Sequence, residues 1–180
     1  MPQMTWQTLL GSPQPTADGS ALASSTTLTD IHPTGNFTIP ANFLYPGSSL
    51  HCRGYGVFST TATPTLLLGA YWGGVAGTAL ATTGAVTTGS GVTNVPFRVH
   101  FDIDVRTIGA TGTVKVSGWF GMGTSVSAWN WLPIPNTANT STVTIDTTAA
   151  KLLSLGAQWS ASSASNTITC QNWKIISVGL

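Results

Sequence analysis

The chain has very little charge. Only 6% of its 180 residues are Asp, Glu, Lys or Arg, and glutamate is absent altogether. An average soluble domain is roughly 25% charged, and monomers usually keep themselves in solution with a surface that is about 25–35% charged. At 42% hydrophobic residues, the chain should nevertheless fold. The composition therefore indicates a surface of hydroxyl and amide groups, part of which is buried against other subunits.

An excess of positive charge is also missing. The net charge is +1 and the first Lys or Arg is Arg53, so no basic N-terminal arm is present. Because nucleic acids are bound through basic surfaces, we expect no nucleic-acid partner. No run approaches the ~18 consecutive apolar residues of a membrane span. The sequence MPQMTWQTLL lacks the basic region and long apolar core of a signal peptide, so we expect no membrane contact and no export signal.

Cysteine is scarce. The two cysteines, Cys52 and Cys170, are too few for a disulfide framework, and they lie too far apart in the sequence for a metal-knuckle pattern. A bridge between them would need two neighbouring strands. We expect buried free thiols, since free cysteine is among the most buried residue types.

Helical periodicity is absent as well. No segment of about ten residues has apolar positions at three-to-four spacing with suitable caps. The chain instead alternates strand-like runs rich in Thr, Val, Ile and Trp with short turns. This pattern predicts an all-β protein, a jelly-roll-like antiparallel β-sandwich. The expected strands span residues 49–59, 64–74, 95–108, 111–123, 141–147, 150–161 and 166–178.

Two segments differ from this pattern. Residues 1–35 are polar and interrupted by Pro and Gly, which predicts an extended N-terminal arm preceding a sandwich domain at 36–180. The arm has enough small residues to lie along a neighbour. Residues 130–140 are rich in Pro and Asn and predict a long loop, with Trp129 and Trp131 exposed beside it. The tryptophans expected in the core are Trp72, Trp119, Trp159 and Trp173.

The run FRVHFDIDVR has the cleanest alternation in the chain. Its apolar residues share one side of the expected strand, and its polar residues share the other. The polar side consists of Arg98, His100, Asp102, Asp104 and Arg106. In a chain with so little charge, this face is the first candidate for a functional site.

A metal or catalytic role for this face has little support in the sequence. Side chains two residues apart on a strand lie about 7 Å apart, too far to bind one small ion without further ligands. The other histidines, His32 and His51, stand in different contexts, and glutamate is absent. The serines lack a G-x-S-x-G elbow, and no phosphate-binding loop is present. We therefore expect no enzyme activity, no cofactor and no metal.

An interface role fits this face better. Arg98 and Arg106 bracket Asp102 and Asp104, so charges of opposite sign alternate along the strand. Cross-strand partners such as Lys115 and Arg53 would extend the pattern. Polar networks of this kind set register and partner choice at subunit contacts. We interpret the polar face, together with Trp129 and Trp131, as a subunit interface.

Three long segments of the sequence are informative as whole phrases: FTIPANFLYPGSSLHCRGYGVFSTTATPTLLLGAYWGG at 37–74, TGSGVTNVPFRVHFDIDVRTIGATGTVKVSG at 88–118 and VTIDTTAAKLLSLGAQWSASSASNTITCQNW at 143–173. They resemble the virion proteins of tailed phages, mostly phages of actinobacteria. The resemblance spans roughly residues 35–178. It implies an oligomeric β-sandwich on the outside of a particle, in a family of minor structural, head decoration and tail proteins.

The resemblance and the composition together predict a head decoration or minor capsid protein. Such a protein would bind the phage major capsid protein from outside as a symmetric oligomer, with a homotrimer expected. It would reach the virion after assembly in the host cytoplasm. Two alternatives are a tail or fibre component that recognises a host glycan through residues 128–136, and a cupin-type metalloenzyme.

Overall fold

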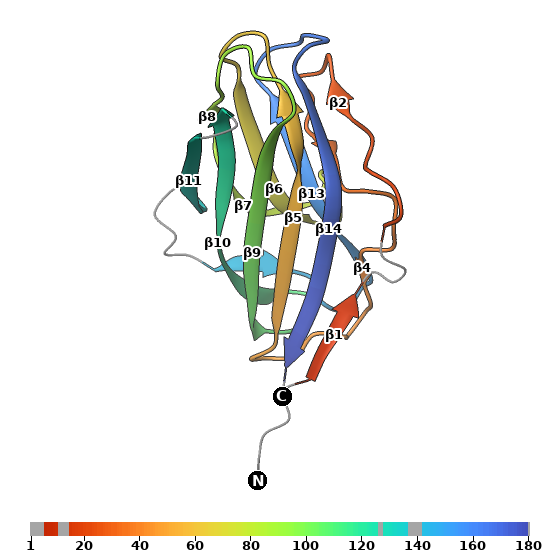
Figure 1. Cartoon of the computed structure of the whole chain (residues 1–180). Helices are drawn as coiled ribbons and strands as arrows, with labels where there is room; N and C mark the ends of the chain where they lie inside the picture. Colours follow the sequence, from red (N-terminus) through yellow and green to blue (C-terminus); the bar gives the residue numbers. More distant parts are fainter. Residues whose placement is uncertain (1–5, 11–14, 126–127, 137–141, 180) are drawn as a thin grey trace.

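The protein is a two-layer β-sandwich. The structure, a computed structural model, describes residues 6–10, 15–125, 128–136 and 142–179. Within these ranges it contains fourteen strands and no helix, and the strands form two antiparallel sheets that pack face to face (Figure 1). This confirms the predicted all-β sandwich. In the part of the chain that is described, no helix is available to cross a membrane.

The larger sheet has eight strands. Its main path runs in the order β1-β14-β5-β9-β10-β11, while β12 pairs with β10 and β2 pairs with β14. The bounds of its strands are Trp6–Leu10 (β1), Leu22–Ala23 (β2), Ser49–Ser59 (β5), Val95–Thr107 (β9), Gly112–Ser125 (β10), Ala128–Ile134 (β11), Val143–Ile145 (β12) and Thr167–Gly179 (β14).

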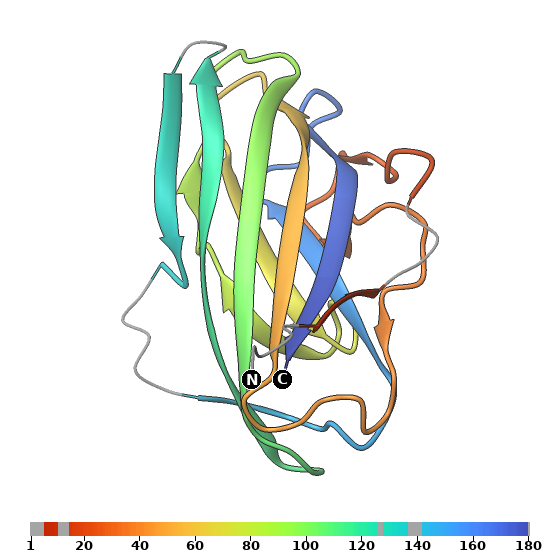
Figure 2. The same cartoon turned by 60° about the horizontal axis from the view of Figure 1, so that its bottom comes forward.

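The smaller sheet has six strands. Its path is β3-β13-β6-β7, with β4 paired to β13 and β8 paired to β6. The bounds are Thr29–Asp30 (β3), Thr38–Ile39 (β4), Thr65–Trp72 (β6), Thr78–Thr82 (β7), Val86–Thr87 (β8) and Lys151–Trp159 (β13). Seen from below, in Figure 2, these strands lie behind the larger sheet and cross it at an angle.

The long strands are paired in a nested order. The first long strand of the larger sheet, β5, pairs with the last strand, β14, and β6 pairs with β13. Strands β9 and β10 form a hairpin around the turn near Gly109. The nested pairs are compatible with a jelly roll.

The core follows from the alternation in the sequence. On β9 every second residue from Val95 to Val105 is at most 2% exposed, and the residues between them reach solvent. The same alternation on β5 buries Leu50, Cys52 and Phe58. These side chains meet Trp159 and others from the smaller sheet in one hydrophobic cluster. Burial of alternate residues therefore fixes which side chains of β5 and β9 face outward.

The structure corrects one predicted element. The segment 130–140 was expected to be a loop, but residues up to Ile134 belong to the strand β11, which pairs with β10. Trp129 and Trp131 therefore lie on a strand. Pro133 is compatible with this strand because β11 is at the edge of the sheet, and edge strands tolerate proline. Residues 137–140 of the expected loop lie outside the described residues.

The N-terminal segment lies along its own sandwich where it is described. β2 pairs with β14 and β3 pairs with β13. Ile31 is 1% exposed, and the side chain of Gln158 donates a hydrogen bond to the carbonyl oxygen of Thr26. Residues 15–35 thus use their short strands within the chain. Residues 1–5 and 11–14 of the predicted arm are outside the described ranges.

The cysteines are free and buried, as expected. β5 and β14 are neighbours, but Cys52 lies opposite Ile175 and Cys170 lies opposite Gly56. Burial raises the pKa of the Cys52 thiol, and it raises the pKa of Cys170 to about 12. Both thiols are therefore protonated, inert parts of the core.

Candidate functional site

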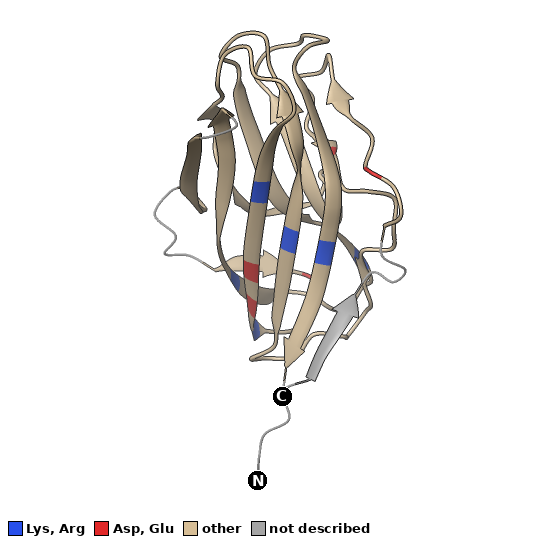
Figure 3. Ribbon diagram, viewed as in Figure 1, with Lys and Arg blue, Asp and Glu red and all other residues tan. Residues whose placement is uncertain are grey.

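Charge is concentrated on the solvent side of the larger sheet, which we call the outer face. Seven of the eleven charged residues of the chain lie on its strands, and none of the seven is buried. Figure 3 shows their positions as bands on β9, β5, β14 and β10. They are Arg53, Arg98, Asp102, Asp104, Arg106, Lys115 and Lys174.

Strand register arranges these residues in rows across the sheet. In an antiparallel sheet, residues directly opposite each other have Cβ atoms only about 5 Å apart, so each row is a set of neighbours. One row consists of Lys174, Arg53, His100 and Trp119. The next row consists of Ile176, His51, Asp102 and Ser117.

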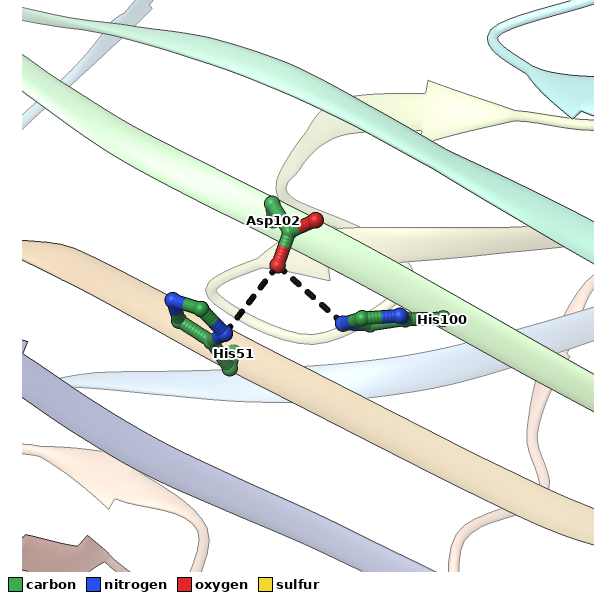
Figure 4. Close-up of side chains that lie close together, drawn as sticks. All are labelled: His51, His100 and Asp102. Atoms are coloured by element: carbon green, nitrogen blue, oxygen red, sulfur yellow. Dashed lines mark ion pairs between the residues drawn. The ribbon is translucent and has the colours of Figure 1, made fainter.

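Two histidines and an aspartate meet between these rows. We call His51, His100 and Asp102 the histidine cluster; Figure 4 shows both imidazoles directed at the same carboxylate. The distance to Asp102 Oδ1 is 3.3 Å from His51 Nδ1 and 3.1 Å from His100 Nε2. His51 is on β5, directly across from Asp102 on β9. The pairing of these two strands therefore creates a cluster that no single strand contains.

His100 is the least exposed member of the cluster. Its side chain is 16% exposed, against 35% for His51 and 36% for Asp102. Burial lowers the pKa of His100 below its usual range. Arg53 and His51 act in the same direction, and Asp102 opposes them. His100 is therefore neutral at pH 7, with one ring nitrogen free to accept a hydrogen bond or bind a metal.

A row of tryptophans continues from the cluster. The ring of Trp119 lies edge-on to His100 at 5.7 Å and edge-on to Trp131 at 4.9 Å, and Trp131 stacks on Trp129 at 5.7 Å. We call Trp119, Trp129 and Trp131 the aromatic row. Their exposed fractions are 37%, 36% and 58%. Three large apolar side chains in contact with one another and with water form a surface that can bind a partner.

Glycine at position 121 makes room for the aromatic row. Gly121 lies opposite Trp131 on the neighbouring strand, and a Cβ atom there would come within 2.5 Å of the indole ring. Without that atom, the ring can lie against the strand backbone beside Trp119. Gly121 therefore allows the exposed indole of Trp131 to lie close to the backbone of the neighbouring strand.

A shallow hollow of about 560 Å³ lies beside His100 on the outer face. Arg53, Arg98 and Lys174 supply positive charge to its wall, and Tyr55 and Trp119 supply rings. No aspartate lines it. The outer face thus combines a cationic hollow, the histidine cluster and the aromatic row. The hollow suits anionic groups of a partner, and the aromatic row suits groups that pack on rings.

The structure brings together most of the residues chosen from the sequence. Arg98 lines the hollow, while His100 and Asp102 form the cluster. Asp104 accepts a hydrogen bond from Ser49 and lies opposite Lys115. Arg106 lies where the register between β9 and β10 shifts.

The arginines and the aspartates of β9 have different neighbours. Within the described residues, no ion pair joins Arg98 or Arg106 to Asp102 or Asp104. Asp102 instead pairs with the two histidines. The alternating charges along β9 are therefore spread over the outer face and do not neutralise one another within the strand.

Two expectations were wrong at this site. Trp119 was expected in the core, but it is 37% exposed, because Val116 and Phe120 face inward and the residues between them alternate outward. His51 was set apart from the cluster, whereas strand pairing brings it to Asp102. Tyr55 and Lys174 were missed as well. The alternation in residues 49–59 already put His51, Arg53 and Tyr55 on one side, but only the register shows what they face.

Comparison with known proteins gives no family. No protein-family model matches the chain, and no curated protein matches its sequence.

Proposed function

We propose that this chain is a structural protein of a tailed-phage virion, namely a head decoration protein that binds the outside of the capsid shell and reinforces it. The composition of the outer face is the main support. Protein interfaces are enriched in Trp, Tyr and Arg, and these residue types supply most binding energy. The outer face presents Trp119, Trp131, Tyr55, Arg53 and Arg98 together.

The rest of the composition supports assembly. Only 6% of the residues are charged. Seven of these eleven residues are on the sheet that also exposes the aromatic row. We propose a symmetric homotrimer that sits on a local symmetry axis of the shell, with the major capsid protein as its partner. The resemblance of residues 35–178 to phage virion proteins supports the particle as its location.

A second candidate is a tail or fibre component that binds a host glycan. The aromatic row supports it, because exposed indole rings can stack on sugar rings, and the cationic hollow next to it would suit an acidic glycan. The geometry favours a cupin-type enzyme less. The histidine cluster lies on the solvent side of the larger sheet, whereas a cupin site lies inside the barrel.

Immunogold electron microscopy of whole virions separates the two phage roles. With antibody against this chain, we expect label distributed over the head. Label confined to the tail or its tip would contradict the decoration role and favour glycan binding through the aromatic row. Virions without label would contradict both.

Charge reversal tests the outer face as the interface. We expect Asp104→Lys to disrupt the oligomer or to weaken shell binding at least about tenfold, since like charges placed together in an interface cost several kcal/mol. Light scattering after gel filtration measures the first, and co-sedimentation with shells measures the second. The matched control is Asp18→Lys, which makes the same charge change at an exposed residue outside the larger sheet. An Asp104→Lys variant that assembles normally would contradict the interface.

A further inference from the structure

The histidine cluster has the donor set of a transition-metal site. It combines two imidazole nitrogens with one carboxylate oxygen, and the three ligand atoms all lie within 4.8 Å of one another. Nitrogen and mixed nitrogen–oxygen donors suit Zn²⁺ and its neighbours in the first transition row, whereas Ca²⁺ and Mg²⁺ take oxygen ligands.

The distances within the cluster fit one small ion. Zinc binds His nitrogen at about 2.0–2.1 Å and carboxylate oxygen at about 2.0–2.2 Å, so two ligands of a tetrahedral site lie about 3.3–3.5 Å apart. The distances to Asp102 Oδ1 are 3.3 Å from His51 and 3.1 Å from His100. Two edges of the tetrahedron are thus nearly in place, and the third, between the two imidazole nitrogens, is no longer than 4.8 Å.

Two of the three ligand atoms have no hydrogen-bond partner. His100 Nε2 and Asp102 Oδ1 are both buried atoms, and although they lie 3.1 Å apart they do not meet the geometry of a hydrogen bond. Buried polar atoms are normally satisfied, because an unsatisfied one costs about 1–3 kcal/mol. A cation between the two would satisfy both at once.

The backbone holds the ligands firmly. His51 and Asp102 are directly opposite on β5 and β9, two central strands of the larger sheet, and His100 is two residues from Asp102 on the same side of β9. Strand register therefore places all three side chains without help from a loop. We propose that His51, His100 and Asp102 bind one Zn²⁺ ion, or a similar divalent transition-metal ion, on the outer face.

The site leaves a coordination position open. Three protein ligands leave the fourth position of a tetrahedral ion for water or for a side chain of a partner. The bound ion would join β5 to β9 beside the aromatic row. This inference does not rest on the virion role, since it requires only these three side chains.

Titration of the tag-free, chelator-treated chain with zinc chloride tests the proposal. Isothermal titration calorimetry should show one Zn²⁺ per chain, and thermal unfolding should shift upward with zinc. Asp102→Asn, which keeps the shape but loses the anionic ligand, and His51→Ala should each weaken binding at least about tenfold, because even residues outside the first coordination sphere affect affinity 10–100-fold. The matched control is His32→Gln, which removes the histidine outside the cluster and should leave binding unchanged.

A measurement on the unaltered chain guards against variants that fail to fold. The protein has three histidines, so their ring signals can be followed individually by ¹⁵N NMR during zinc addition. We expect the signals of His51 and His100 to shift and those of His32 to stay. Absence of binding, binding that survives both cluster variants, or shifts at His32 alone would overturn the proposal.

Discussion

Each sheet has an aromatic ring packed against a glycine on its outer side, but the ring is buried on the smaller sheet and exposed on the larger one. On the smaller sheet, Tyr71 lies against Gly156, where a Cβ atom would come within 2.8 Å of its ring, and Val75 packs beside it; Tyr71 is 4% exposed. On the larger sheet, Trp131 lies against Gly121 in the same way but is 58% exposed.

The two sheets also differ in the number of charged residues on their strands. The strands of the smaller sheet include two charged residues, Asp30 and Lys151, against seven on the larger sheet. On the smaller sheet, other residues of the chain bury the ring of Tyr71. On the larger sheet, aromatic rings and charged groups are exposed to solvent. Sandwich geometry alone therefore does not explain why the aromatic row is exposed. The larger sheet is the side available to a partner.

Removing a core tryptophan and an exposed one should separate the two roles most strongly. Trp159, on the smaller sheet, is 1% exposed, so Trp159→Ala should lower the free energy of unfolding by about 3–5 kcal/mol through the cavity it leaves. Trp131→Ala should cost only about 1 kcal/mol, mainly its ring contacts with Trp119 and Trp129. Urea unfolding measures both. Similar losses would mean that Trp131 is part of the core.

Filling the two glycine positions gives a smaller contrast. Gly156→Ala forces a methyl group against an enclosed ring and should cost about 1–3 kcal/mol, as overpacking does. Gly121→Ala should cost less than about 1 kcal/mol, since Trp131 can swing toward solvent, and should change tryptophan fluorescence. Thermal unfolding and emission spectra test this pair. A costly Gly121→Ala would show that the indole is held as tightly as Tyr71.

The smallest effect is expected for the two buried cysteines, whose thiols should not react in the folded protein. Burial raises the pKa of Cys52 and raises that of Cys170 to about 12, so thiol reagents at pH 8 should not label the native chain. After unfolding in guanidinium, they should label two thiols per chain. Rapid labelling before unfolding would contradict a closed core behind the outer face.

Alternation made the main strands predictable from sequence. Residues 49–59 were predicted as a strand and coincide with β5, and residues 95–108 differ from β9 by one residue at the C-terminal end. Both strands bury one face against the core and leave the other in solvent, which is the condition that produces a period of two. The strand β11 was missed because Pro133 and its neighbours read as a loop, although an edge strand tolerates proline.

The candidate site was only half predictable. His100 and Asp102 share the polar face of one strand, and that follows from alternation alone. His51 joins them through pairing between strands that are far apart in the sequence, so local pattern says nothing of it. Trp119 was predictable in principle: counting from Val116 puts it on the polar side, but its place inside a strand pattern suggested the core.

Radical footprinting of the free chain and of purified virions tests the central claim most directly. If the outer face binds the particle, oxidation of Trp119, Trp129 and Trp131 should fall severalfold in virions, while Tyr45, which is 40% exposed outside the strands of the larger sheet, should react as before. Equal oxidation of the three tryptophans in both samples, or absence of the chain from virions, would contradict the account.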